Sequence, residues 1–256
     1  MFLSTTQIKL INKLKNKKER DELGLFIVEG IKCVNEAIAS GWTIETLVFE
    51  KGFDENRILY GKEDLRAKKF FVPIDGIQRI QTVKTWPGVM AVVRQKRYAL
   101  TDITDGTVII ALENVADPGN LGTIIRTCDW FGVKNIMLSE NSVDVYNEKT
   151  VRGTMGSIFR TRVYESITIM EDIAKMKKNG YSVYALTLDG EDVKETKLAS
   201  KNSIYLFGNE STGLTEYVVE KADKKYKISG GGNRIDSLNL AVSVGVVLNN
   251  IINLKS

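Results

Sequence analysis

Histidine is absent from the 256-residue sequence, and cysteine occurs only twice. The missing imidazole excludes a Ser-His-Asp hydrolase, a Cys-His protease and most zinc enzymes, because each of these uses histidine as a base or as a ligand. Cys33 and Cys128 are far apart and form no CxxC pair, so the sequence indicates neither a disulfide framework nor a zinc site. We therefore expect chemistry that uses other side chains and no metal.

Long apolar runs are also missing. The longest ones, such as Ala241 to Leu248, are interrupted by serine or glycine and are too short to span a membrane. Polar residues interrupt the apolar ones after Met1, so no signal-peptide core is evident. These features lead us to expect a cytoplasmic protein that does not bind membranes.

The net charge of +4 is concentrated at the N-terminus. Residues 1–20 carry six basic side chains and one acidic side chain, which leaves the other 236 residues at about −1. Such a charge run is often only a solvated helix face or a fraying terminus. Alternatively, it forms a phosphate-binding patch with salt-sensitive affinity for nucleic acid. The candidates for contacting nucleic acid in this run are Lys13, Lys15, Lys17, Lys18 and Arg20.

Apolar periodicity predicts a compact α/β unit in residues 1–95. Helices are expected near residues 8–14, 31–40, 57–65 and 77–83, and strands at 25–28, 46–49, 69–72 and 89–93. In residues 96–106 the periodicity stops and polar turn residues accumulate, so we expect a linker there.

The second domain, residues 107–256, begins with the continuous apolar run Thr107 to Leu112, which is typical of a strand covered on both faces. Further strands are expected at 135–138, 162–164, 182–188, 203–207 and 226–228, and helices at 121–130, 147–155, 169–178, 214–222 and 238–253. This alternation predicts a parallel sheet flanked by helices. The last segment is rich in valine and also suits a strand, but its length favours a helix.

Three loops follow expected strands at the sheet edge where ligands usually bind. The first loop begins at Glu113 and leads into a helix whose apolar stripe turns Arg126 to the other side. The second has a Gly-x4-Gly spacing without the lysine of a nucleotide triphosphate loop. The third is glycine-rich but has Ile235 where a dinucleotide site needs its last glycine, which leaves an oxidoreductase poorly supported. Each loop alone is also compatible with an ordinary surface turn.

Together the three loops resemble the signature of the SpoU (TrmH) family of RNA ribose 2′-O-methyltransferases, in the SPOUT superfamily. The matching stretches are Asn120-Leu121-Gly122 with Arg126-Thr127-Cys128, Phe207-Gly208-Asn209-Glu210 with Gly213-Leu214, and Ser237-Leu238-Asn239 with Ala241-Val242-Ser243. The segment Val151 to Phe159 is similar to one that the family places between its first two motifs, and Arg152 is a further RNA-binding candidate there. Residues 1–95 are similar to the ribosomal-protein-like substrate-binding domain of many members, chiefly through Phe26 to Gly30 and Gly88 to Val92.

The resemblance implies an α/β fold with a knotted, parallel-sheet SPOUT methyltransferase domain at 107–256. A linker at 96–106 would join it to a smaller N-terminal α/β RNA-binding domain at 1–95. The resemblance also implies S-adenosylmethionine (SAM), held largely by backbone groups of the knot loops. Gly208, Ile228 and Leu238 match the family's cofactor positions, and Thr187 is a further candidate. Without the family, Ile228 and Leu238 would be taken for core residues. Ser229 stands where members commonly have proline, so the third loop departs from the family pattern.

Arg126 matches the arginine to which the family assigns the central catalytic role. Because a guanidinium stays protonated, we expect it to hold a substrate phosphate and to place charge near the hydroxyl rather than to act as the base. The other polar positions of the motifs would orient Arg126, the nucleotide or the loops, and they are Asn120, Glu210, Ser237 and Asn239. Any of them could instead cap a helix, and for Ser237 the two interpretations are balanced.

The expected function is SAM-dependent methyl transfer to a ribose 2′-hydroxyl in structured RNA. Ribosomal RNA is the expected substrate, because a separate RNA-docking domain suits a large folded target. Transfer RNA is the alternative substrate, and an RNA-binding protein of the same fold without catalysis is the alternative function. Family members are dimers. The last helix is compatible with a homodimer, although burial within one subunit explains its valines as well.

Overall fold

The computed structural model describes the whole chain except residues 60–66, 104–107, 197, 199–200, 232–236 and 254–256. It forms two compact units. The first unit contains residues 1–96 together with 144–160, and the second contains residues 97–143 together with 161–256. A segment from the middle of the chain therefore packs with the N-terminal residues.

The first unit is built on a four-stranded sheet in the order β1-β4-β2-β3. Strand β4 is antiparallel to both β1 and β2, and β3 is parallel to β2. The strands are β1 (Leu25–Glu29), β2 (Ile44–Glu50), β3 (Lys68–Val72) and β4 (Val89–Arg94). The helices of this unit are α1 (Thr5–Lys13), α2 (Lys17–Leu23), α3 (Ile31–Ala39), α4 (Ile74–Ile77) and α6 (Glu148–Gly153), with 3-10 turns at Glu55–Arg57 and Ser157–Phe159.

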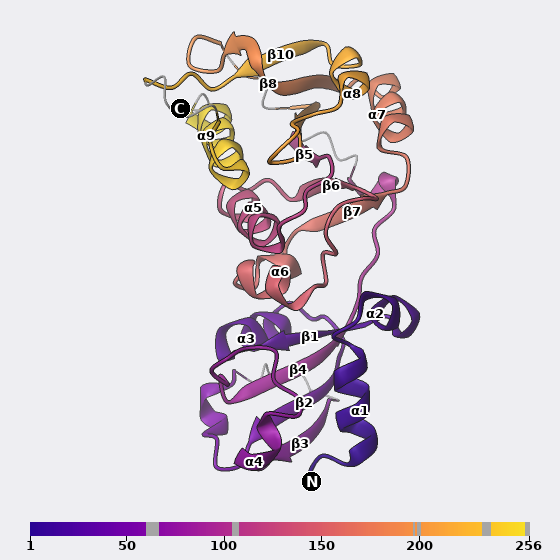
Figure 1. Ribbon diagram of the computed structural model, residues 1–256, viewed down its shortest axis with the longest axis vertical. Coiled ribbons are helices and arrows are strands. Elements are labelled where there is room, and N and C mark those ends of the chain that lie inside the picture. Colours follow the sequence, from indigo (N-terminus) through magenta and orange to yellow (C-terminus); the bar gives the residue numbers. More distant parts are fainter. Residues whose placement is uncertain (60–66, 104–107, 197, 199–200, 232–236, 254–256) are drawn as a thin grey trace. The chain divides into compact units, whose positions relative to one another are not determined.

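Alternating residues of β1 face the two sides of this sheet, as a strand requires. Ile27 packs in the cluster that includes Ile11 and Leu14, at the end of α1. On the other side, the Phe26 ring lies 4.6 Å from that of Tyr146, which belongs to the segment 144–160. Figure 1 shows α1 on one side of the sheet and α3 on the other.

The helix expected at residues 77–83 is wrong in position, because α4 ends at Ile77 and only turns follow it. The backbone N–H of Thr82 donates to the carboxylate of Glu29 at 3.0 Å, and this bond replaces the helical one. The helix expected at 57–65 lies mostly outside the described residues.

The second unit contains six strands in one parallel sheet, in the order β10-β8-β9-β5-β6-β7. The strands are β5 (Val108–Leu112), β6 (Asn135–Ser139), β7 (Arg162–Ser166), β8 (Ser182–Asp192), β9 (Ser203–Phe207) and β10 (Lys224–Lys227). The helices are α5 (Pro118–Trp130), α7 (Ile169–Lys178), α8 (Glu216–Glu220) and α9 (Leu240–Asn253), with a 3-10 turn at Leu100–Ile103. The predicted alternation and the parallel sheet are confirmed.

Helices cover both faces of this sheet, with α5 and α9 on one side and α7 and α8 on the other (Figure 1). The valine-rich last segment is a helix, and its inward residues Val244, Val247 and Leu248 are fully buried. Helix α9 packs against α5, where a methyl group added at Gly245 would lie 3.7 Å from Thr127. In the described part of the chain, no helix is long and apolar enough to cross a membrane.

Candidate active site

Most of the motif residues lie in or directly after the three loops that leave the sheet of the second unit at the carboxyl ends of β5, β9 and β10. The side chain of Asn120 is hydrogen-bonded to the other two loops. Its Nδ2 donates to Oε1 of Glu210 at 2.9 Å, and its Oδ1 accepts from Nδ2 of Asn239 at 3.0 Å. Three residues that are up to 119 positions apart in the sequence therefore form one hydrogen-bonded group.

Helix α5 carries two of the candidates. It begins with Pro118 after Asp117, whose Oδ1 accepts the backbone N–H of Asn120 at 2.8 Å. This cap fixes the first turn and therefore the position of the Asn120 amide. Arg126 lies farther along the same helix, where its side chain is exposed and forms no hydrogen bond or ion pair with the residues that the structure describes.

Asn239 caps helix α9. Its Oδ1 accepts the backbone N–H groups of Ala241 at 2.9 Å and Val242 at 3.4 Å, while its Nδ2 remains directed at Asn120. One amide thus places the end of the glycine-rich loop against α5. Ser237 is exposed and lies two residues before this cap, so the capping interpretation is wrong for Ser237 and applies to Asn239.

The loop after β9 is a closed turn. The backbone N–H groups of Asn209 and Gly213 each donate to the other residue's carbonyl oxygen, at 3.0 and 2.9 Å. Gly208 lies so close to this closure that an added Cβ would be 2.0 Å from the carbonyl carbon of Gly213. Only glycine fits at position 208, because backbone atoms cannot yield as a side chain can.

Sequence reasoning missed the residues that hold this turn in place. Glu113 is 6% exposed, and its carboxylate accepts from both the backbone N–H and the hydroxyl of Thr215, each at 2.9 Å. The carbonyl oxygen of Asn114, a residue with a φ of 56°, accepts from Nδ2 of Asn209 at 2.7 Å. Asparagine is the residue that most readily tolerates this left-handed backbone, so the pair Glu113-Asn114 after an apolar strand was a usable signal.

The proposed cofactor positions lie on or beside the same edge of the sheet. The hydroxyl oxygen of Thr187 is buried. Thr187 lies in the part of β8 between Ala185 and Glu191, where the register of the pairing with β10 shifts. Leu238 is 48% exposed and Ile228 is half-buried, so the interpretation of Leu238 as core is wrong. A buried hydroxyl, a turn without room for a Cβ and an exposed leucine fit a ligand held by backbone groups and apolar contact.

The RNA-binding candidates of the first unit differ in how far they are exposed to solvent. Lys13, Lys17 and Lys18 are exposed, and Lys15 is half-buried with its Nζ donating to the carbonyl oxygen of Gln81 at 3.1 Å. Arg152 is also half-buried, and one of its guanidinium nitrogens is buried without a hydrogen-bond partner in the described part of the chain.

The prediction that Arg20 contacts RNA is wrong. Its side chain is 3% exposed, and its Nε donates to Oδ2 of Asp144 at 2.9 Å. A second guanidinium nitrogen donates to the carbonyl oxygen of Leu14 at 2.8 Å. Arg20 instead ties the segment 144–160 to α2 within the first unit.

Neither cysteine offers a thiolate. Burial raises the pKa of Cys33 and of Cys128 above the ordinary value for a thiol, so both stay protonated and unreactive at neutral pH. Among the described residues, no group of three or more acidic or cysteine side chains could hold a metal ion.

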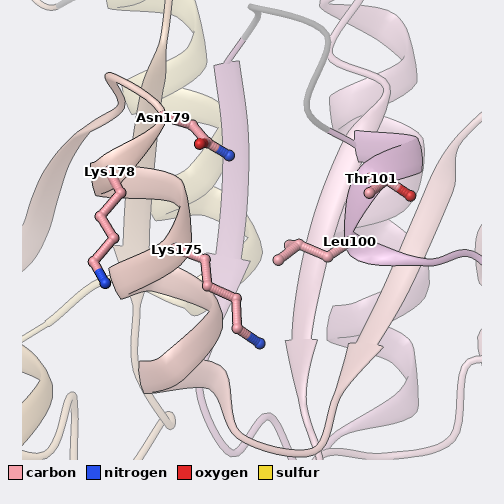
Figure 2. Close-up of a pocket in the computed structure, with 5 residues that line it drawn as sticks. All are labelled: Leu100, Thr101, Lys175, Lys178 and Asn179. Atoms are coloured by element: carbon pink, nitrogen blue, oxygen red, sulfur yellow. The ribbon is translucent and has the colours of Figure 1, made fainter.

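A cavity of about 360 Å³ is separate from the candidate site. It is lined by Leu100, Thr101, Lys175, Lys178 and Asn179 (Figure 2). These residues belong to α7 with its C-terminal cap and to the 3-10 turn at Leu100–Ile103, on the face of the sheet opposite α5 and α9. None of the site candidates lines it.

Comparison with known proteins gives consistent matches over most of the chain. The SpoU rRNA Methylase family matches residues 107–249, and the MRM3-like substrate binding domain matches residues 5–86. The 23S rRNA (guanosine(2553)-2'-O)-methyltransferase RlmP of Bacillus subtilis (strain 168) is 28% identical over 244 residues, which are 94% of each protein.

Two solved structures have the same fold. An AdoMet-bound rRNA methyltransferase from Sinorhizobium meliloti is 33% identical with a TM-score of 0.85, over 98% of this chain and 96% of that one. A TrmH-family protein from Porphyromonas gingivalis is 27% identical with a TM-score of 0.86, over 99% and 100% of the two chains. The predicted α/β fold with a parallel SPOUT-type sheet and a smaller N-terminal domain is thereby confirmed.

Proposed function

The chain belongs to the SpoU rRNA Methylase family, and on this basis we propose that it methylates ribose 2′-hydroxyl groups of structured RNA with SAM as the methyl donor. The observation that carries the proposal is the hydrogen-bonded group of Asn120, Glu210 and Asn239, which brings the three motif loops to one place. Loops at one edge of a parallel sheet lie near one another in any case, but direct hydrogen bonds among the motif side chains go beyond that proximity.

The residues that would hold SAM are Thr187, Gly208, Ile228 and Leu238. When bound, SAM supplies an electrophilic methyl group on a sulfonium centre. The buried hydroxyl of Thr187 offers a hydrogen bond to a polar edge of the ligand, and the exposed Leu238 offers apolar contact. The closed turn at Gly208 presents backbone groups without a side chain in the way.

Methyl transfer requires a hydroxyl in line with the donated methyl group, and the hydroxyl must lose its proton. Arg126 suits the first task, because its exposed guanidinium has no partner among the described residues and can form paired hydrogen bonds with a phosphate. Asn120 holds Glu210 and Asn239 in fixed positions beside α5. Ser237 is exposed two residues before Asn239 and would contact the nucleotide.

Ribosomal RNA is the proposed substrate. The relative from Bacillus subtilis is a 23S rRNA methyltransferase and aligns over 94% of this chain, which includes most of residues 1–95. Those residues match a substrate binding domain and carry the exposed lysines Lys13, Lys17 and Lys18. Phosphate contacts by such lysines position an RNA without reading its sequence.

We further propose a homodimer, a trefoil-knotted chain path in the second unit and a cytoplasmic location, all of which accord with family membership. Trp130 on α5 is 85% exposed and Val242 on α9 is 51% exposed. Apolar side chains exposed on two helices that pack together suit a contact between copies. Light scattering on the purified protein measures the oligomeric state.

Replacing Arg126 with alanine tests the function. We expect Arg126→Ala to abolish methylation of ribosomal RNA while SAM still binds, because the side chain contacts the RNA phosphate rather than the cofactor. Lys134→Ala is the control, since Lys134 is an exposed cation of the second unit outside the site. The assay combines transfer of labelled methyl groups with calorimetric titration of SAM.

Three outcomes separate the alternatives. Full activity in Arg126→Ala rejects the role of the arginine. Absence of SAM uptake by the unmodified protein rejects the enzyme and favours an RNA-binding protein without catalysis. Mapping ribose methylation across total RNA, from cells with and without the protein, distinguishes ribosomal from transfer RNA.

A further inference from the structure

The buried carboxylate of Glu113 is the strongest feature that the proposed function does not use. It follows the last residue of β5, and its backbone N–H donates to the carbonyl oxygen of Phe207, the last residue of β9. The side chain is 6% exposed, and no described lysine or arginine forms an ion pair with it. In the described part of the chain, the hydrogen bonds to this carboxylate come from Thr215. A buried charge is costly, and among these residues Thr215 alone offsets that cost.

The geometry points to Glu113 as a positioning residue for the SAM-binding turn, an inference that rests on the proposed function. Thr215 directly follows Leu214 at the end of the turn, and Glu113 holds it through two bonds. The start of the turn is held by the next residue, Asn114, whose carbonyl oxygen accepts from Asn209. The two residues that leave β5 therefore fix both ends of the turn.

What lies between these ends belongs to the candidate site. Glu210 accepts the hydrogen bond of Asn120, and Gly208 lies against the backbone of Gly213. If Thr215 were released, Gly213 and the backbone groups around Gly208 would lose their fixed position relative to β5. Glu113 thus acts on SAM through the turn, without touching the ligand.

The chain contains the same arrangement at a second place, in the first unit. Glu29, at the end of β1 and 8% exposed, accepts from the backbone N–H of Thr82 at 3.0 Å and from its hydroxyl. This pair holds no part of the candidate site. It is therefore a matched control for the loss of the same hydrogen bond.

The experiment compares Thr215→Val with Thr82→Val, each of which replaces a hydroxyl by a methyl group of similar size. SAM affinity is measured by calorimetry well below the melting temperature of each variant. We expect Thr215→Val to weaken SAM binding on the order of tenfold, the usual effect of one hydrogen bond to a charged group. Thr82→Val should lower the melting temperature by a similar amount and leave SAM affinity within about twofold of the unmodified protein.

Two conservative changes complete the test. Thr215→Ser keeps both donors and should restore the affinity. Glu113→Gln should also retain most of it, because its amide oxygen accepts from the Thr215 N–H while its amide group donates to the hydroxyl oxygen. Full SAM affinity in Thr215→Val, or an equal loss in Thr82→Val, would overturn the positioning role alone. A lack of SAM binding by the unmodified protein would reject the proposed function together with this role.

Discussion

Gly208 offers the sharpest test of the closed turn after β9. A Cβ at this position would lie 2.0 Å from the carbonyl carbon of Gly213, 2.1 Å from the nitrogen of Leu214 and 2.3 Å from the carbonyl oxygen of Gly213. All three are backbone atoms, so relief requires the turn itself to open. Opening removes the two bonds between Asn209 and Gly213, each worth about 1 kcal/mol.

The expected loss in Gly208→Ala is therefore about 2 kcal/mol, with a further 1 kcal/mol or more from overpacking. Two kcal/mol corresponds to a factor of about 30 in an equilibrium constant. If SAM binding requires the closed turn, as the proposed function implies, the SAM dissociation constant should rise by about 30-fold or more. Calorimetric titration at 25 °C measures it, and a thermal melt confirms that each sample is folded.

Gly213→Ala is the control within the same turn. Its φ is 70°, and no atom lies within 4 Å of an added Cβ. The cost is then only that of an alanine in the left-handed backbone conformation, about 1 kcal/mol. This cost corresponds to a factor of about five in the SAM dissociation constant. Binding of SAM by Gly208→Ala within threefold of the unmodified protein would refute the closed turn as a requirement, as would equal damage by the two variants.

Two further predictions concern stability. Arg20→Met should lower the free energy of unfolding by about 3–5 kcal/mol, because it leaves the buried Asp144 carboxylate without its cation, whereas Lys17→Ala at an exposed position should change it by less than about 0.5 kcal/mol in urea unfolding. Burial works to raise the pKa of Asp172, but hydrogen bonds from Ser166, Tyr164 and Lys175 outweigh it and lower the pKa overall. A lowered pKa stabilises the fold above the ordinary aspartate range, and this contribution is lost as the pH falls. Urea unfolding at pH 7 and at pH 3.5 should therefore show the unmodified protein losing more stability in acid than Asp172→Asn, and equal losses would contradict the role of this cluster.

Much of the second unit could be predicted from local patterns. Buried parallel strands are continuous apolar runs, and the helices between them carry an apolar stripe, so the alternation is visible without long-range information. The convergence of Asn120, Glu210 and Asn239 was also predictable, because carboxyl ends of parallel strands meet at one edge. The contact of Arg126 with a substrate phosphate remains a prediction, as do the domain boundaries.

Three of the errors share one cause, which is partners distant in the sequence. Arg20 looks like a surface cation until Asp144, 124 residues later, is placed beside it. The helix expected at 77–83 fails because Glu29 takes the N–H of Thr82. Glu113 was overlooked since its partner Thr215 lies 102 residues away. Local periodicity contains no information on such pairs.

The segment 144–160 has a consequence for how this two-part architecture can change over evolutionary time. Tyr146 and Phe159 pack against Phe26, and Arg160 pairs with Glu36. A stretch flanked on both sides by second-unit residues therefore completes the interior of the first unit. A different N-terminal domain joined to residues 97–256 would have to provide aromatic side chains that pack against Tyr146 and Phe159. Otherwise these two rings would be exposed to solvent. Swapping of substrate-recognition modules at this junction is thus restricted to donors that bring a compatible sheet face.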